Sequence, residues 1–161
     1  MSAYEIAKAI DEVVLKVQTA SQAVAKAGVF GNAQYNNGVS VGMVANVQEF
    51  GLPSKNIPPR SFMRTTVAEQ RSKWAKIAES YARNGEVTST MGVAMMRAIG
   101  AIAEGDIKSK IASIQEPPLS PRTVAARARK RADKTITSTL TKPLVDTGLL
   151  LSSIHHVVEG E

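Results

Sequence analysis

The sequence predicts an α+β fold, in which a small antiparallel β-sheet, made of a hairpin plus a C-terminal strand, is packed by three or four helices. Apolar residues recur at spacings of three and four over residues 3–23, 62–83 and 88–116, which is typical of amphipathic helices. They alternate with other residues over 25–30, 39–44 and 153–159, which is typical of strands. With 161 residues, the chain has the length of one domain, so we expect a single domain over residues 1–161.

The first two strands are expected to form the hairpin. Residues 31–38, Gly-Asn-Ala-Gln-Tyr-Asn-Asn-Gly, are rich in turn formers and separate the two alternating segments. The third strand, at 153–159, would then close on this hairpin.

The chain is expected to change from strands to helices at a proline-rich corner, residues 48–64. Gly51 can adopt a positive φ, while Pro53, Pro58 and Pro59 fix φ and remove backbone donors, so no helix or central strand can pass through. Ser61 is the expected N-cap of the helix that follows. A rigid and exposed corner suits docking, and the side chains we expect it to offer are those of Phe50, Arg60, Phe62 and Arg64.

The second half of the chain carries clear helix boundaries. Thr88, Ser89 and Thr90 offer caps for a long helix that Pro117-Pro118 would terminate. Ser120-Pro121 places a cap before a proline at the first helical position, which predicts a short basic helix to about residue 132. Residues 129–142 are basic and threonine-rich, with little to bury, and predict a flexible loop.

Positive charge is concentrated in one segment. Residues 120–142 contain seven cations and one anion, and their excess equals the net charge of +6 of the whole chain. Two interpretations stay open: a solvated or intersubunit salt-bridge surface, or a contact with DNA phosphates or an acidic partner. The residues that would make the second contact are Arg122, Arg127, Arg129, Lys130, Arg131 and Lys134.

Several classes of site are disfavoured. The chain has no cysteine, which excludes disulfides, thiolate catalysis and cysteine-ligated zinc. Asp146-Thr147-Gly148 matches the aspartic-protease signature, but it follows a proline and precedes three leucines, so we expect Asp146 or Thr147 to cap a helical turn. The adjacent histidines 155 and 156 would face opposite sides of a strand and could not readily share a metal. We therefore expect no enzyme, no cofactor and no metal site.

The location of the chain is predicted from two further patterns. No run of eighteen apolar residues occurs, so no membrane partner is expected. The first residues lack the layout of a signal peptide, so we expect synthesis in a cytoplasm.

Four motif segments follow one another along the chain in a recognisable order. They are Glu49-Phe50-Gly51, Ile57-Pro58-Pro59-Arg60-Ser61-Phe62-Met63-Arg64, Leu119-Ser120-Pro121-Arg122-Thr123, and the segment from Pro143 to Ile154 with Asp146-Thr147-Gly148 inside it. In this order they resemble the tail-completion and minor tail proteins of long-tailed bacteriophages, a group of phage neck proteins. The family often has an arginine after the Asp-Thr-Gly turn where this chain has Leu150 and Leu151, so a contact made by that arginine is not implied here.

The resemblance implies a structural virion protein of the phage neck, made in the cytoplasm of the host bacterium. It implies a homo-oligomeric ring, a hexamer or alternatively a dodecamer, around the channel through which DNA passes without sequence recognition. Expected neighbours are neck or head-tail adaptor proteins and the tail tube or tail terminator protein. The alternative is a small basic protein that binds the DNA backbone. The expected subunit or partner interface comprises Phe50, Pro58, Pro59, Arg60, Phe62, Arg64, Asp146 and Thr147.

Overall fold

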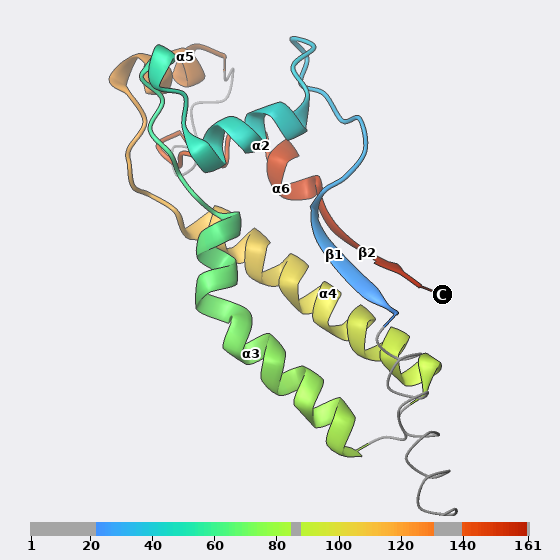
Figure 1. Cartoon of the computed structure of the whole chain (residues 1–161). Coiled ribbons are helices and arrows are strands. Elements are labelled where there is room, and N and C mark those ends of the chain that lie inside the picture. Colours follow the sequence, from blue (N-terminus) through green and yellow to red (C-terminus); the bar gives the residue numbers. More distant parts are fainter. Residues whose placement is uncertain (1–21, 85–87, 131–139, 161) are drawn as a thin grey trace, which may run out of the picture. The chain divides into compact units, whose positions relative to one another are not determined.

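The computed structural model describes residues 22–84, 88–130 and 140–160 (Figure 1). These residues divide into two compact units. The described residues of the first unit are 22–27, 70–84, 88–103 and 156–160. The described residues of the second unit are 28–69, 104–130 and 140–155. Each unit therefore joins segments that are distant in sequence, and the expectation of a single domain stays a prediction.

The sheet has two antiparallel strands, β1 (Val24–Val29) and β2 (Ile154–Glu159). Together with the helices they confirm the α+β class and the C-terminal strand. In the first unit, Lys26 Nζ on β1 lies 2.6 Å from Glu159 Oε2 at the end of β2, and this ion pair links the two strands. His156 packs against Gly100, where a Cβ atom would come within 2.8 Å of the imidazole ring.

The predicted hairpin is wrong. Its second strand was expected at residues 39–44, but residues 41–44 belong to helix α2 (Val41–Phe50). The Ser40 hydroxyl accepts a hydrogen bond from the Met43 N–H and caps this helix. Val41, Ala45 and Glu49, four residues apart, form its buried face. Strand β1 consequently pairs with β2, and within the described part of the expected hairpin an isolated bridge joins Gln34 and Ser40.

The proline corner begins where α2 ends. Gly51 has a φ of 79°, as expected, and its N–H donates to the Val47 carbonyl. A Cβ atom here would lie 2.9 Å from the Ile57 carbonyl oxygen, so glycine is required by space as well as by conformation. A short 3₁₀ turn, η1 (Pro53–Lys55), then leads to a bridge between Leu52 and Ile57.

The later helices confirm the predicted boundaries. They are α3 (Met63–Asn84), α4 (Ser89–Ser113), α5 (Pro121–Lys130) and α6 (Leu149–Ser152). Thr88 and Ser120 cap α4 and α5 by accepting hydrogen bonds from the N–H groups of Met91 and Thr123. The helix expected at 3–23 lies outside the described residues, as does 131–139 of the expected loop.

The core of the second unit forms where α2, α3, α4 and α6 supply apolar side chains. Helix α2 packs against α6. The apolar side chains of this unit that are at most 6% exposed are Val41, Phe62, Ile107, Ile111, Leu144, Leu150 and Ile154. Across the described ranges, no helix is long and apolar enough to cross a membrane.

Candidate interface around the proline corner

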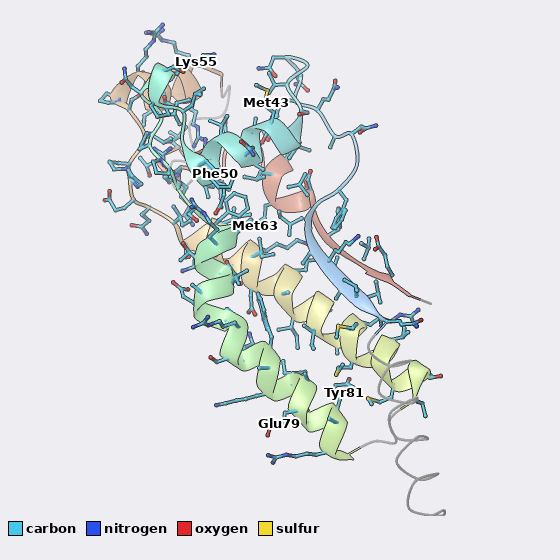
Figure 2. The ribbon with its side chains drawn as sticks, viewed as in Figure 1. Met43, Phe50, Lys55, Met63, Glu79 and Tyr81 are labelled. Carbon is cyan, nitrogen blue, oxygen red and sulfur yellow. The ribbon has the colours of Figure 1, made fainter. Side chains whose placement is uncertain are left out.

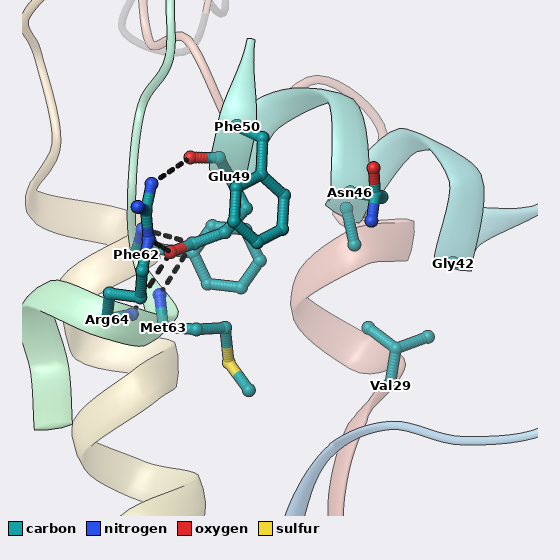
Figure 3. A pocket seen from close by; sticks show the side chains of 9 residues that line it. Val29, Gly42, Asn46, Glu49, Phe50, Phe62, Met63 and Arg64 are labelled. Carbon is teal, nitrogen blue, oxygen red and sulfur yellow. Dashed lines mark hydrogen bonds and ion pairs between the residues drawn. The ribbon is translucent and has the colours of Figure 1, made fainter.

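The carboxylate of Glu49, at the end of α2, caps the start of α3 (Figure 3). It accepts hydrogen bonds from the N–H groups of Phe62 and Met63, both at 2.9 Å, and of Arg64 at 3.1 Å. The Ser61 hydroxyl donates to the same carboxylate at 2.5 Å. Ser61 was expected to be the N-cap. Its hydroxyl instead binds the carboxylate of Glu49, twelve residues earlier, which caps the helix. A helix N-terminus has unpaired N–H groups and a positive dipole end, which explains why it attracts a carboxylate.

The environment of Glu49 keeps the buried carboxylate ionised. Burial favours the neutral acid and raises its pKa, but the hydrogen bonds from Ser61, from two backbone N–H groups and from the Arg64 side chain more than offset burial. The net effect lowers the pKa of Glu49 from 4.5 to about 2. The corner is therefore held by a charged group over the whole physiological pH range.

Arg64 is exposed and held in one orientation. Its Nε donates to Glu49 Oε1 and its Nη2 to the Glu49 backbone oxygen, both at 2.9 Å. Its guanidinium carbon lies 4.7 Å from the centroid of the Phe50 ring, a cation–π contact. The Arg64 side chain is 61% exposed and Phe50 is 57% exposed. The structure thus leaves both residues accessible, as expected.

The exposure expected for Arg60 and Phe62 is wrong. Phe62 is 1% exposed and lies in the core, and Arg60 is 5% exposed. Arg60 donates through Nε to the Pro117 carbonyl at 2.7 Å and through Nη2 to the Pro118 carbonyl at 2.8 Å. These carbonyls follow the end of α4 and have no helical partner, so a buried guanidinium satisfies them. Neither side chain is available to a partner in this structure.

Burial also shapes the charge of Arg60. Removal from water is the main cause that lowers the pKa of its guanidinium, and the nearby positive charge of Arg127 lowers it further. Two arginines are thus brought close together inside the second unit, each bound to backbone oxygens.

Arg127, expected to face DNA or an acidic partner, instead points inward. Its Nη1 donates to the Lys142 carbonyl at 2.7 Å and its Nη2 to the Pro143 carbonyl at 3.1 Å. Its Nε lies 3.5 Å from Asp146 Oδ1, and its side chain is only 11% exposed. Assigning Arg127 to a partner contact was therefore wrong, because the residue holds the segment after α5.

The remaining predicted site residues divide by exposure. Pro59, Asp146 and Thr147 are exposed and Pro58 is partly buried. The Thr147 hydroxyl accepts a hydrogen bond from the Leu149 N–H, and Gly148 has a φ of 78°, which together start α6. Of the basic residues, Arg122 and Arg129 are exposed on α5, which ends at Lys130, while Arg131 and Lys134 lie outside the described residues.

An apolar hollow of about 340 Å³ lies between α2, the start of α3 and the end of β1 (Figure 3). Phe50 and Arg64 lie at this hollow, and Met43 and Val67, which are 62% and 49% exposed, belong to the same two helices. Figure 2 shows Met43 and Phe50 on α2 and Met63 at the start of α3. The lining residues are Val29, Gly42, Ala45, Asn46, Glu49, Phe50, Phe62, Met63 and Arg64.

The sequence did not reveal this surface in full, since Met43 was assigned to a strand. The signal that could have found it was Ser40 with Gly51, a cap pair that delimits a helix and places Met43 and Phe50, seven residues apart, on one face. The apolar hollow with one fixed cation, Arg64, suits the binding of a protein segment. Its lining residues do not include a nucleophile next to a general base. Within the described part of the chain, no three metal-ligating side chains gather.

Comparison with protein-family models, with curated proteins and with solved structures found no match to this chain.

Proposed function

We propose that this protein is a structural subunit of a bacteriophage neck, a tail-completion or head-tail joining protein that assembles as a homo-oligomeric ring around the DNA channel. One observation carries most of the support. The four motif segments behind the resemblance all belong to the second unit. Glu49 connects the first two directly, and Arg60 and Arg127 bind the chain at or next to the other two. Motif segments that are held together within one unit of the fold support a common fold better than four unconnected sequence matches do.

The contacts of Glu49, Arg60 and Arg127 each hold one motif segment close to another. Glu49 joins the first segment to the second by capping α3. Arg60, in the second, binds the two carbonyls that directly precede the third. Arg127, on the helix that the third segment starts, binds the Pro143 carbonyl and Asp146 of the fourth.

The exposed surface also suits an assembly protein. Exposed apolar side chains at Met43, Phe50 and Val67 are concentrated on two helices of the second unit, and such patches mark protein interfaces when they are contiguous. Among the described residues the sheet additionally has only two strands, and unpaired strand edges invite pairing with another chain. Contacts with sister subunits in the virion would cover these surfaces.

A monomeric protein that binds the DNA backbone is the second candidate. It is favoured by Arg122 and Arg129, which are exposed and lie seven residues apart on one face of α5. In this case the affinity would fall steeply with salt and would not depend on DNA sequence.

The two candidates differ in a simple measurement. Size-exclusion chromatography with light scattering, over a hundredfold range of concentration, should give a closed oligomer for a neck subunit, and negative-stain images should show rings. A chain that stays monomeric throughout and retards DNA only in low-salt gels would support the second candidate instead. Antibody labelling of phage particles at the head-tail junction would then test the location of the oligomer.

A further inference from the structure

The described residues expose five large hydrophobic side chains, and these fall into two groups, one in each unit. The first group, Met43, Phe50 and Val67, lies on the two helices that border the apolar hollow in the second unit. The second group, Val24 and Val157, lies on the strands in the first unit. The cation Arg64 lies beside the first group, and the ion pair of Lys26 and Glu159 lies beside the second, so the carboxylate of Glu159 is the one group of that pair that could bind Arg64.

The strand surface is formed by alternate residues of β1 and β2. Val24 and Lys26 are exposed on β1, and Val157 and Glu159 are exposed on β2. Because residues two apart face the same side of a strand, the ion pair between Lys26 and Glu159 places both valines on one face. We call Val24, Val157 and Glu159 the strand patch.

The cation at the hollow can accept another partner. A guanidinium has five N–H donors, and Arg64 uses two of them on Glu49 within the described residues. Stacking on Phe50 and the bond to Glu49 fix its orientation, so little rotamer entropy is lost when a carboxylate binds its outer edge. The hollow with Arg64 at its rim is therefore suited to an apolar side chain followed by an acid.

We propose that the strand patch of a second copy of this chain docks in the hollow, with Val157 in the apolar space and Glu159 on Arg64. Two residues along a strand are separated by about 7 Å, so one strand can offer the valine and the carboxylate together. The carboxylate has two oxygens and keeps Lys26 as its second partner. The inference rests on the proposed function, since it names the contact by which the subunits would join.

This contact has a consequence for symmetry. The two surfaces are different, so one copy offers its hollow while its neighbour offers its strand patch. Head-to-tail contacts of this type close into a ring when the rotation between copies allows it. Each subunit of a ring would then use both surfaces once.

Cysteine trapping tests the contact directly, because the chain has no cysteine of its own. Asn46→Cys places a thiol at the hollow and Val157→Cys places one on the strand patch. The two single variants are mixed under mild oxidation, one of them carrying a tag so that mixed dimers differ in size from symmetric ones. We expect mixed dimers to predominate. The control pairs Val157→Cys with Lys55→Cys, an exposed position on η1.

Charge reversal tests the same contact without a covalent bond. Glu159→Arg leaves the second unit untouched and should weaken self-association by about tenfold, as expected for like charges brought together. Arg64→Gln, which adds no second acid beside Glu49, should weaken self-association to a similar extent, and the double variant with Glu159→Arg should lose less than the sum of the two single losses. Glu79→Arg is the matched control, since it also removes an exposed ion pair, with Arg83, but lies in neither surface.

The outcomes separate the two proposals. A wild-type chain that is monomeric at every concentration overturns the proposed ring and the contact with it. A wild-type chain that self-associates, but gives no more mixed dimers than the Lys55→Cys control and shows fully additive losses in the double variant, overturns the contact alone. Circular dichroism confirms that each variant is folded before it is scored.

Discussion

Replacing Glu49 by glutamine removes one charge from the corner while keeping nearly the same shape. The amide can still accept through one oxygen, but it has no negative charge for the N-terminus of α3 or for Arg64. Helix α3 then loses its charged cap, and the second unit loses a contact between two of its segments. We expect a clear loss of stability at neutral pH.

The magnitude follows from the pKa of Glu49. Folding lowers this pKa from 4.5 to about 2, and each pH unit corresponds to about 1.4 kcal/mol, so the ionised carboxylate stabilises the fold by about 3 kcal/mol at pH 7. A carboxyl group whose pKa is lowered by folding contributes fully above its unfolded pKa and loses this contribution as the pH falls through the folded value. Between pH 4.5 and pH 2 the difference between wild type and Glu49→Gln should therefore shrink, to about 1 kcal/mol at pH 3.

Urea unfolding followed by circular dichroism measures this difference. At pH 7 the midpoint of Glu49→Gln should lie roughly 1 M below that of the wild type, given an m value of about 2–3 kcal/mol/M. Glu79→Gln is the control, because its exposed ion pair with Arg83 should contribute less than about 0.5 kcal/mol. Equal midpoints for Glu49→Gln and wild type at pH 7, or a gap that stays constant down to pH 3, would refute the capping role.

Three further perturbations have defined outcomes. Gly51→Ala should destabilise the chain by about 1–3 kcal/mol in the same urea assay, since alanine is strained at positive φ and its Cβ would contact the Ile57 oxygen; a neutral result would mean that the corner relaxes. Arg60→Lys should cost about 2–4 kcal/mol, because one ammonium cannot reproduce the fork that binds two carbonyls, and wild-type stability would show that the fork is dispensable. The double variant Arg122→Glu, Arg129→Glu should keep the wild-type melting temperature but reduce retention on DNA or an acidic partner at low salt, whereas unchanged retention would assign α5 to solvent.

The sequence predicted those elements whose ends are marked locally. Thr88 and Ser120 sit directly before the helices they cap, and Gly148 precedes the turn it starts. The second strand of the hairpin, expected at 39–44, was a wrong prediction. Over so short a length, the apolar residues of 39–50 fit both the period of two of a strand and the period near four of a helix. Packing of Val41 and Ala45 against the core decides in favour of the helix.

The roles of Glu49 and Arg60 could not be predicted, for a different reason. Nothing near Glu49 indicates that its carboxylate caps a helix that starts fourteen residues later. The partners of Arg60 lie more than fifty residues away and are backbone carbonyls, which carry no signature in the sequence. A charged residue beside prolines therefore suggests an exposed surface, although here it completes the interior.

The preference of Glu49, Arg60 and Arg127 for main-chain atoms bears on how such a protein can evolve. Peptide N–H and C=O groups are common to nearly all amino acids. The segments that these side chains bind can therefore change most of their residues without losing the hydrogen bonds. Neutral substitutions would then remove most of the sequence similarity between relatives. The three side chains Glu49, Arg60 and Arg127, with a few turn residues, would maintain the fold. Relatives of such a chain are better sought by the spacing of these three residues than by overall identity.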